Sequence, residues 1–160
     1  MKLNGGVEWA LHCCVVLTTV QTPVPMTQLA ELHDVSSSYL AKQLQALSRA
    51  GIIHAVQGHA GGYLLTRPAK DITVLDVVEA IDGKDSTFVC TEIRQRGPLA
   101  TPPQDCKKAC PVARAMIRAD HAWREALRAT TIADLVADVR RDSGPAALPR
   151  VGAWLAGDET

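Results

Sequence analysis

The chain has 160 residues, 47% of them hydrophobic, with 17 basic and 17 acidic residues that give a formal net charge of zero. This length and apolar content allow one domain with a real core, or a small domain with an oligomerisation arm, and little more. Zero net charge excludes a uniformly basic nucleic-acid binder, so any attraction to DNA must come from uneven charge. The charge is indeed uneven, because residues 35–70 contain four Lys or Arg residues and no Asp or Glu.

The first predicted element is a helix over residues 5–20, in which apolar side chains recur at helical spacing. Glu8 and His12 interrupt its apolar run, and no small-residue cleavage site follows. We therefore expect no membrane span and no export signal, and a cytoplasmic location. Five cysteines, an odd number, then indicate reduced thiols that are free to bind a metal.

Two short helices follow, over residues 26–35 and 36–50. Ser36 is a good N-cap for the second helix, and Gly51 stands where a C-terminal glycine stop is expected. The buried stripe of that helix is predicted to be Leu40, Leu44 and Leu47. Two helices joined by so short a turn predict a helix-turn-helix motif.

A two-stranded hairpin is predicted over residues 52–67. Glycines supply the unusual backbone angles of its turn, namely Gly58, Gly61 and Gly62. Another helix is expected over residues 73–81, ending at Gly83. This order of elements predicts a winged helix-turn-helix domain over residues 1–83, a mainly α fold with a small β-hairpin wing.

The segment of residues 84–109 has no sustained period and several prolines, so it is predicted to be a loop. Pro111 suits the first turn of a long helix, and Thr131 caps a further one, together covering residues 110–139. The apolar face of the long helix is predicted to consist of Val112, Met116, Ala119, Trp123 and Leu127. We expect residues 140–160 to form a loosely ordered tail, in which Trp154 and Leu155 can dock on the body.

Polar side chains without an acid among them point outward from the predicted helix over residues 36–50. Such side chains suit phosphates and base edges in the major groove. DNA contacts are predicted for Ser37, Ser38, Tyr39, Lys42, Gln43 and Arg49. The alternative is a small α/β domain whose helix surface is only solvated.

The stretches "SSSYLAKQLQALSRAGII" and "GHAGGYLLTRPAKDITVLDVVEAIDG" resemble the DNA-binding half of the Rrf2 family, the IscR- and NsrR-like iron-sulfur transcription regulators. The opening "MKLNGGVEWAL" and the long helix with Trp123 extend this resemblance over about residues 1–139. It implies a homodimer with crossed long helices that binds two-fold-related double-stranded DNA. Where members often carry Arg at the wing tip this chain has Gln57, so wing contacts are expected from His59, Gly61 and Arg67.

The resemblance also implies an iron-sulfur cluster held by three loop cysteines, here Cys90, Cys106 and Cys110, and one other ligand. Fifteen residues separate the first two cysteines and three the last two, which departs from the family's spacing. IscR-like members carry a histidine three residues after the last cysteine, where this chain has Ala113. NsrR-like members take a carboxylate from the partner's first helix, and the matching residue here is Glu8.

His12 follows Glu8 by four residues, so both lie on one helix face and can reach the same metal. We predict a 2Fe-2S cluster with Glu8, His12, Cys90 and Cys110 as ligands. Cys110 is favoured because the positive end of the following helix stabilises an anionic sulfur. Cys106 is the alternative ligand. A four-iron cluster held by the three thiolates and Glu8 stays open, although it leaves His12 unused.

The functional hypothesis is a transcription regulator in which the redox state of the cluster reorients the two winged domains. A zinc-stabilised DNA-binding protein is an alternative, since the same ligands suit zinc. A thiol-disulfide switch between Cys106 and Cys110 is another, because neighbouring lysines lower a thiol pKa. Cys13 and Cys14 are expected to be structural. An enzyme is disfavoured, because no nucleophile stands at a recognisable spacing from a base.

Overall fold

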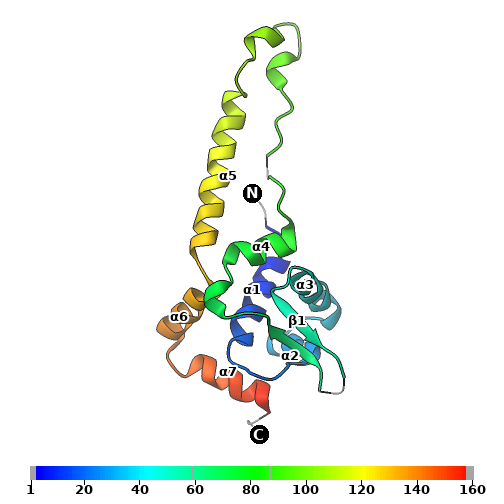
Figure 1. Cartoon of the computed structure of the whole chain (residues 1–160), viewed down its shortest axis with the longest axis vertical. Coiled ribbons are helices and arrows are strands. Elements are labelled where there is room, and N and C mark those ends of the chain that lie inside the picture. Colours follow the sequence, from blue (N-terminus) through cyan, green and yellow to red (C-terminus); the bar gives the residue numbers. More distant parts are fainter. Residues whose placement is uncertain (1–2, 59, 87, 158–160) are drawn as a thin grey trace.

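A winged helix-turn-helix body carries one long helical arm (Figure 1). The computed structural model describes residues 3–58, 60–86 and 88–157. The body and arm consist of α1 (Gly6–Leu17), α2 (Met26–Leu32), α3 (Ser37–Arg49), β1 (Ile53–Val56), β2 (Gly62–Leu65), α4 (Val74–Asp82), α5 (Pro111–Ala129), α6 (Ile132–Ser143) and α7 (Ala147–Ala156). Of the helices in these ranges, none is long and apolar enough to cross a membrane.

The helix-turn-helix motif formed by α2 and α3 follows the local signals of the sequence. The Ser36 side chain accepts a hydrogen bond from the Tyr39 N–H at 3.3 Å, which caps the first turn of α3. The predicted stripe of Leu40, Leu44 and Leu47 is fully buried. Gly51 has a φ of 68°, the left-handed conformation that ends helices at low cost. The predicted motif is confirmed.

The hairpin pairs β1 with β2 in antiparallel register, with Ile53 opposite Leu65. Of its tip glycines only Gly58 has a positive φ, 106°, so the unusual angles predicted for the other two are wrong. Those two glycines are needed for space. A Cβ on Gly62 would lie 2.3 Å from the Val24 carbonyl, and one on Gly61 would lie 2.4 Å from the Val56 oxygen.

Helix α1 lies at the centre of the core and contacts α3, α4, α6 and α7. Cys13 and Cys14 are fully buried in it, in agreement with their predicted structural role. Burial raises the pKa of the Cys13 thiol to about 12 and also raises that of Cys14, so both remain protonated at neutral pH. They therefore behave as small apolar side chains.

The base of the arm is joined to the body by backbone hydrogen bonds. The Val74 N–H donates to the Thr130 carbonyl at 2.8 Å, and the Ile132 N–H donates to the Ile72 carbonyl at 2.9 Å. Each side of this junction starts a helix with a capping box, that of Thr73 for α4 and that of Thr131 for α6. These contacts fix where the arm leaves the body.

The loosely ordered tail predicted for residues 140–160 is wrong over residues 140–143, which end α6, and over residues 147–156, which form α7. Pro149 is compatible with α7 because it lies in the first turn, where its missing N–H has no intrahelical partner to lose. Leu148 and Leu155 are buried, which confirms the docking expected of Leu155. The Gln28 side chain also donates to two carbonyls at the end of α7, at 3.1 and 3.3 Å.

The docking of α7 can be tested at Gly152, where a Cβ would lie 3.1 Å from the Thr19 carbonyl oxygen. We expect Gly152→Val to lower the free energy of unfolding by about 1–3 kcal/mol, because added methyl groups overpack this contact. Chemical denaturation measures the effect. Ala156→Val, at an exposed position of the same helix, is the control and should leave stability nearly unchanged. Equal stability of the two variants would show that α7 does not pack here.

Candidate nucleic-acid interface and metal centre

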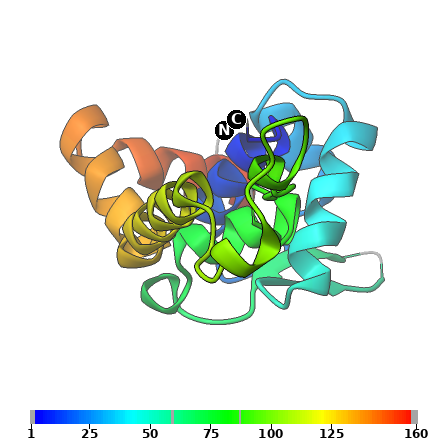
Figure 2. The same cartoon turned by 90° about the horizontal axis from the view of Figure 1, so that it is seen from above.

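Helix α3 and the hairpin lie on the same side of the body, away from α6 (Figure 2). Most of the predicted DNA-contact residues on α3 are accessible there. Exposed side chains are Ser38, Tyr39, Lys42 and Arg49, while Ser37 is half-buried. Gln45 is exposed on the same helix and was missed by the sequence reasoning. This surface carries cations and hydrogen-bonding groups without a carboxylate, as a phosphate-binding helix requires.

Gln43 does not belong to this surface, so its predicted DNA contact is wrong. The residue is 3% exposed, and its side chain fills the space beside Gly6 of α1, where a Cβ would lie 2.4 Å from its Oε1. Its position was readable from the pattern, because it falls between Leu40 and Leu47 at the i+3 spacing of the buried stripe. Gln43 was assigned to the surface because it is polar, although the helical period places it on the buried stripe.

Arg67 lies at the base of the wing, and its guanidinium is used inside the chain. Its Nε donates to the Asp71 carbonyl at 2.9 Å, and its Nη1 to the Gly51 carbonyl at 3.0 Å. Its Nη2 also pairs with the Asp76 carboxylate at 3.4 Å. Because each of the three side-chain nitrogens makes one of these bonds, the predicted DNA contact of Arg67 gives way to a structural role. His59, another predicted contact, lies outside the described residues.

Cys110 is the N-cap of α5, and Cys106 ends the short 3-10 turn Pro103–Asp105 that precedes it, while Cys90 lies earlier in the segment that leads to the outer end of the arm. Arg94 holds this loop together. Its side chain pairs with Glu92 at 2.7 Å and donates to the Lys108 carbonyl at 2.6 Å, while its own carbonyl accepts from the Thr101 N–H at 2.7 Å. Sequence reasoning missed this residue, because the carbonyls that it contacts cannot be identified from a pattern of residue types.

All five cysteines are free thiols, and Cys110 has the most activated environment among the three in the loop. The backbone N–H groups of Ala113 and Val112, at the start of α5, lower its pKa, and Arg94 lowers it further. The helix-end effect predicted for Cys110 is therefore present. The cation beside it is Arg94 rather than the neighbouring lysines. Cys90 is exposed, and its Sγ lies 3.9 Å from the Glu92 carboxylate.

Glu8 and His12 are both exposed on one face of α1, as their spacing predicts. They line a groove of about 350 Å³ between α1 and α6, together with Asp138 and Asp142. The body and the cysteine loop stand at opposite ends of the arm (Figure 1). One chain therefore does not bring the predicted ligands together, and within the described ranges no three Cys, His, Asp or Glu side chains gather around a possible metal position.

His33, which was given no role, contacts the candidate ligand His12. The ring centroids of His12 and His33 are 5.8 Å apart in an edge-to-face arrangement. Trp9, which is on the same helix as His12, has its ring centroid 6.1 Å from that of His33. The His33 Nε2 is buried and has no hydrogen-bond partner among the described residues, and burial is the main cause that lowers the pKa of His33. His33 follows the last residue of α2, so His12 reaches the turn of the helix-turn-helix motif.

The family model described as "Rrf2: Iron-dependent Transcriptional regulator" matches residues 3–138. Protein aau3 of Rhizobium meliloti is 37% identical over 109 residues, which are 68% of this chain and 67% of that relative. IscR of Cereibacter sphaeroides is 35% identical over 86 residues, 51% of this chain and 56% of the relative. YwgB of Bacillus subtilis is 33% identical over 90 residues, 55% of this chain and 58% of that relative. The chain therefore spans little more than half the length of IscR and of YwgB.

Solved structures share the fold. CymR of Bacillus subtilis, described as its global cysteine regulator, superimposes with a TM-score of 0.66 at 23% identity, covering 86% of this chain and 97% of that one. IscR of T. potens gives a TM-score of 0.61 at 22% identity, covering 88% and 90%. The predicted fold class, mainly α with a β-hairpin wing, is confirmed.

The lowered pKa of Cys110 predicts fast alkylation in metal-free protein. In a Cys90→Ser/Cys106→Ser variant, the rate at which iodoacetamide modifies Cys110 should reach half of its maximum at a lower pH than the rate for an ordinary exposed thiol, because the Cys110 thiolate forms at lower pH. Mass spectrometry across a pH series measures this rate. Cys13 and Cys14 should stay unmodified and serve as internal controls. A midpoint at or above that of glutathione would contradict the predicted activation.

Proposed function

Because this chain belongs to the Rrf2 family of transcriptional regulators, we propose that it is a homodimeric DNA-binding regulator that senses redox state through a 2Fe-2S cluster. The observation that carries the proposal is the separation of two groups of metal ligands by the length of the arm. Cys106 and Cys110 precede the outer end of α5, whereas Glu8 and His12 lie on α1 in the body. A second copy of the chain is then needed to complete the site.

The exposed surface of the arm supports dimer formation. Three large apolar side chains on the outer half of α5 remain exposed in the single chain, at 61% for Val112, 42% for Met116 and 45% for Ile117. Such a stripe on a helix is usually covered by another helix. In a symmetric dimer with crossed arms, two α3 helices then face two half-sites about one turn of DNA apart, roughly 34–36 Å.

The donor set fits an iron-sulfur cluster. Cys110 is activated as a thiolate by the helix end, and Cys90 is exposed at the surface of the loop. Glu8 and His12 are exposed and face one groove, so they can approach a metal brought by the partner's loop. A neutral imidazole in place of a thiolate lowers the negative charge around the irons and raises the reduction potential of such a cluster, which allows it to cycle under mild conditions.

The contact between His12 and His33 connects this site to DNA binding. His12 lies on α1 and His33 at the end of α2, beside the turn that leads into α3. A shift of the His12 ring on a change of metal charge would press on the helix-turn-helix turn. Because two half-sites must be bound together, a small change in the orientation of either α3 lowers affinity for the complete site.

The ligand assignment predicts the effect of two substitutions on α1. Anaerobically purified Glu8→Ala and His12→Ala proteins should lose or shift the visible absorption of the cluster, and iron and sulfide should fall, because each change removes a ligand. His121→Ala is the matched control, since His121 is exposed on α5. Unchanged spectra and metal content in both α1 variants would contradict the assignment. Iron and sulfide counts, before and after dithionite, distinguish two-iron from four-iron clusters.

The α3 surface predicts a specific change in DNA binding. Lys42→Ala should weaken binding to the duplex that wild-type protein enriches from a random library. The slope of log affinity against log salt should fall by about 1, because one phosphate contact is lost. Arg140→Ala, exposed on α6, is the charge-matched control. Fluorescence anisotropy over a salt series measures both, and equal slopes for Lys42→Ala and wild type would contradict a phosphate contact.

A thiol-disulfide switch is a second candidate function, favoured by the lowered pKa of Cys110 and by the closeness of Arg94 to both Cys106 and Cys110. Iron-free protein that responds to an oxidant, and loses this response in a Cys106→Ser variant, would support it. A colourless protein that contains zinc would instead favour the structural-metal alternative.

A further inference from the structure

We propose that Arg67 and Arg124 clamp α4 between α3 and the arm and are positioning residues for DNA binding. This inference rests on the proposed function as a dimeric DNA-binding regulator. Arg124 fixes one end of α4 to α5, and Arg67 fixes the other end to the C-terminus of α3. The clamp thereby sets the angle between the arm and the helix that reads DNA.

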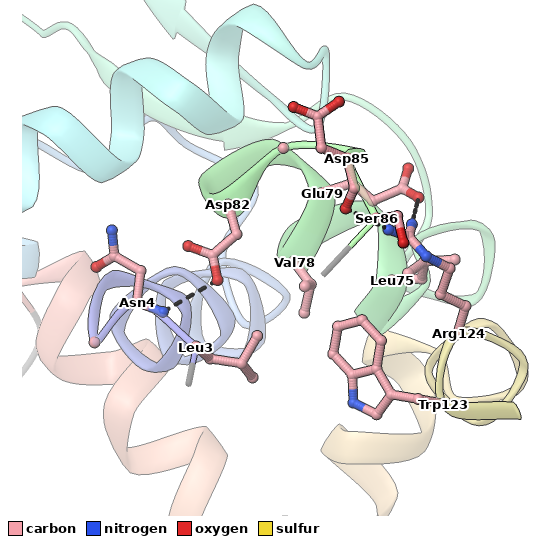
Figure 3. Close-up of a pocket in the computed structure, with 12 residues that line it drawn as sticks. Leu3, Asn4, Leu75, Val78, Glu79, Asp82, Asp85, Ser86, Trp123 and Arg124 are labelled. Carbon is pink, nitrogen blue, oxygen red and sulfur yellow. Dashed lines mark hydrogen bonds and ion pairs between the residues drawn. The ribbon is translucent and has the colours of Figure 1, made fainter. Parts of the chain in front are cut away.

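Arg124 forms the joint between the arm and α4 (Figure 3). Its Nη1 pairs with Glu79 of α4 at 2.8 Å, and its Nε pairs with Asp120 of α5 at 2.9 Å. Its Nη2 donates to the carbonyls of Lys84 and Asp85, both at 3.1 Å, just beyond the end of α4. The Arg124 and Glu79 side chains are only 16% and 19% exposed, so solvent screens this joint less than a surface ion pair.

Arg67 forms the joint between α4 and α3. It pairs with Asp76 in the first turn of α4 and donates to the carbonyl of Gly51, which follows the C-terminal end of α3. The Thr66 hydroxyl donates to the same Gly51 carbonyl at 2.6 Å. The end of α3, the start of α4 and the base of the wing therefore meet at one guanidinium.

Helix α4 links the two joints as a short rigid rod. Asp76 and Glu79 are three residues apart and so lie on one face. Both border a cavity of about 180 Å³ that is also lined by Ala50 and Arg67. The capping box between Thr73 and Asp76 holds the first turn of α4, so a force on the Glu79 end is passed to the Asp76 end.

The apolar contacts of the arm do not fix its angle by themselves. Trp123 and Leu127 pack on Val74 and Val78, and a cavity of about 540 Å³ opens beside Trp123 between the N-terminal segment, α4 and α5. Apolar packing is non-directional, and the empty space beside these side chains permits α5 to rotate relative to α4. The hydrogen bonds of Arg124 are directional, because its planar fork contacts two carboxylates and two carbonyls. Together with the backbone hydrogen bonds at the base of the arm, they define one orientation of the arm.

The first experiment uses DNA. Wild-type protein, with its metal, enriches a two-fold-related duplex from a random library, and variants of this duplex with base pairs added or removed between the half-sites are then compared. We expect Arg124→Ala and Arg67→Ala each to weaken binding to the best spacing by about fivefold or more and to flatten the preference among spacings. Binding to an isolated half-site and iron content should stay unchanged.

Two controls separate positioning from simple stability. Arg128→Ala removes an ion pair with Glu125 on the same helix, where both side chains are mostly exposed, and it should keep the wild-type spacing preference. The charge-swapped pair Glu79→Arg/Arg124→Glu should regain part of that preference. Equal loss of affinity for half-sites and complete sites would overturn the proposal, as would an unchanged spacing preference in Arg124→Ala.

A second measurement tests the clamp without DNA. It applies even if wild-type protein enriches no duplex from the library, a result that would contradict the proposed function but not the clamp. Hydrogen exchange should speed up at the Gly51 and Ile52 amides in Arg124→Ala, because loosening α4 frees the end of α3. These amides bond to carbonyls of α3 at 3.0 Å, so wild-type exchange is slow. Faster exchange confined to α4 and α5 would overturn the proposal.

Discussion

The length of α5 is the constraint on which the candidate metal centre depends. A helix of 19 residues spans roughly 28 Å at 1.5 Å per residue, and it stands out from the body without folding back. The loop thiols are therefore held far from Glu8 and His12 of their own chain. Metal binding by the complete set of proposed ligands would require a second chain, and the metal would then link two winged bodies. A chemical change at such a metal would then act directly on the geometry of the dimer.

Two routes connect that position to the DNA-facing surface. The first is local, from His12 across the ring contact to His33 and the turn before α3. The second runs through the arm, whose base is fixed by backbone bonds between Val74 and Thr130 and by the partly buried ion pairs of Arg124. Both routes end at α3, and both consist of directional contacts in a body whose centre is otherwise packed by apolar side chains of α1.

Features set by local physics were predictable from the sequence. The Ser36 cap, the leucine stripe of α3 and the helix-end activation of Cys110 each depend on residues within one or two helical turns. Features set by tertiary contact were not: whereas the buried position of Gln43 follows from the helical period of α3, the use of Arg67 on backbone carbonyls depends on segments brought together only by folding. The same holds for the His12 contact with the distant His33, and the ligand assignment remains a prediction.

The division of ligands between two chains is tested most directly by mixing two inactive proteins. A Glu8→Ala/His12→Ala variant keeps the thiols, and a Cys90→Ser/Cys110→Ser variant keeps the α1 ligands. If the site is shared between subunits, their mixed dimer contains one complete set of ligands. Reconstitution should then give it about half of the wild-type iron and visible absorption per dimer. A mixed dimer that binds no more iron than either parent would contradict the shared site.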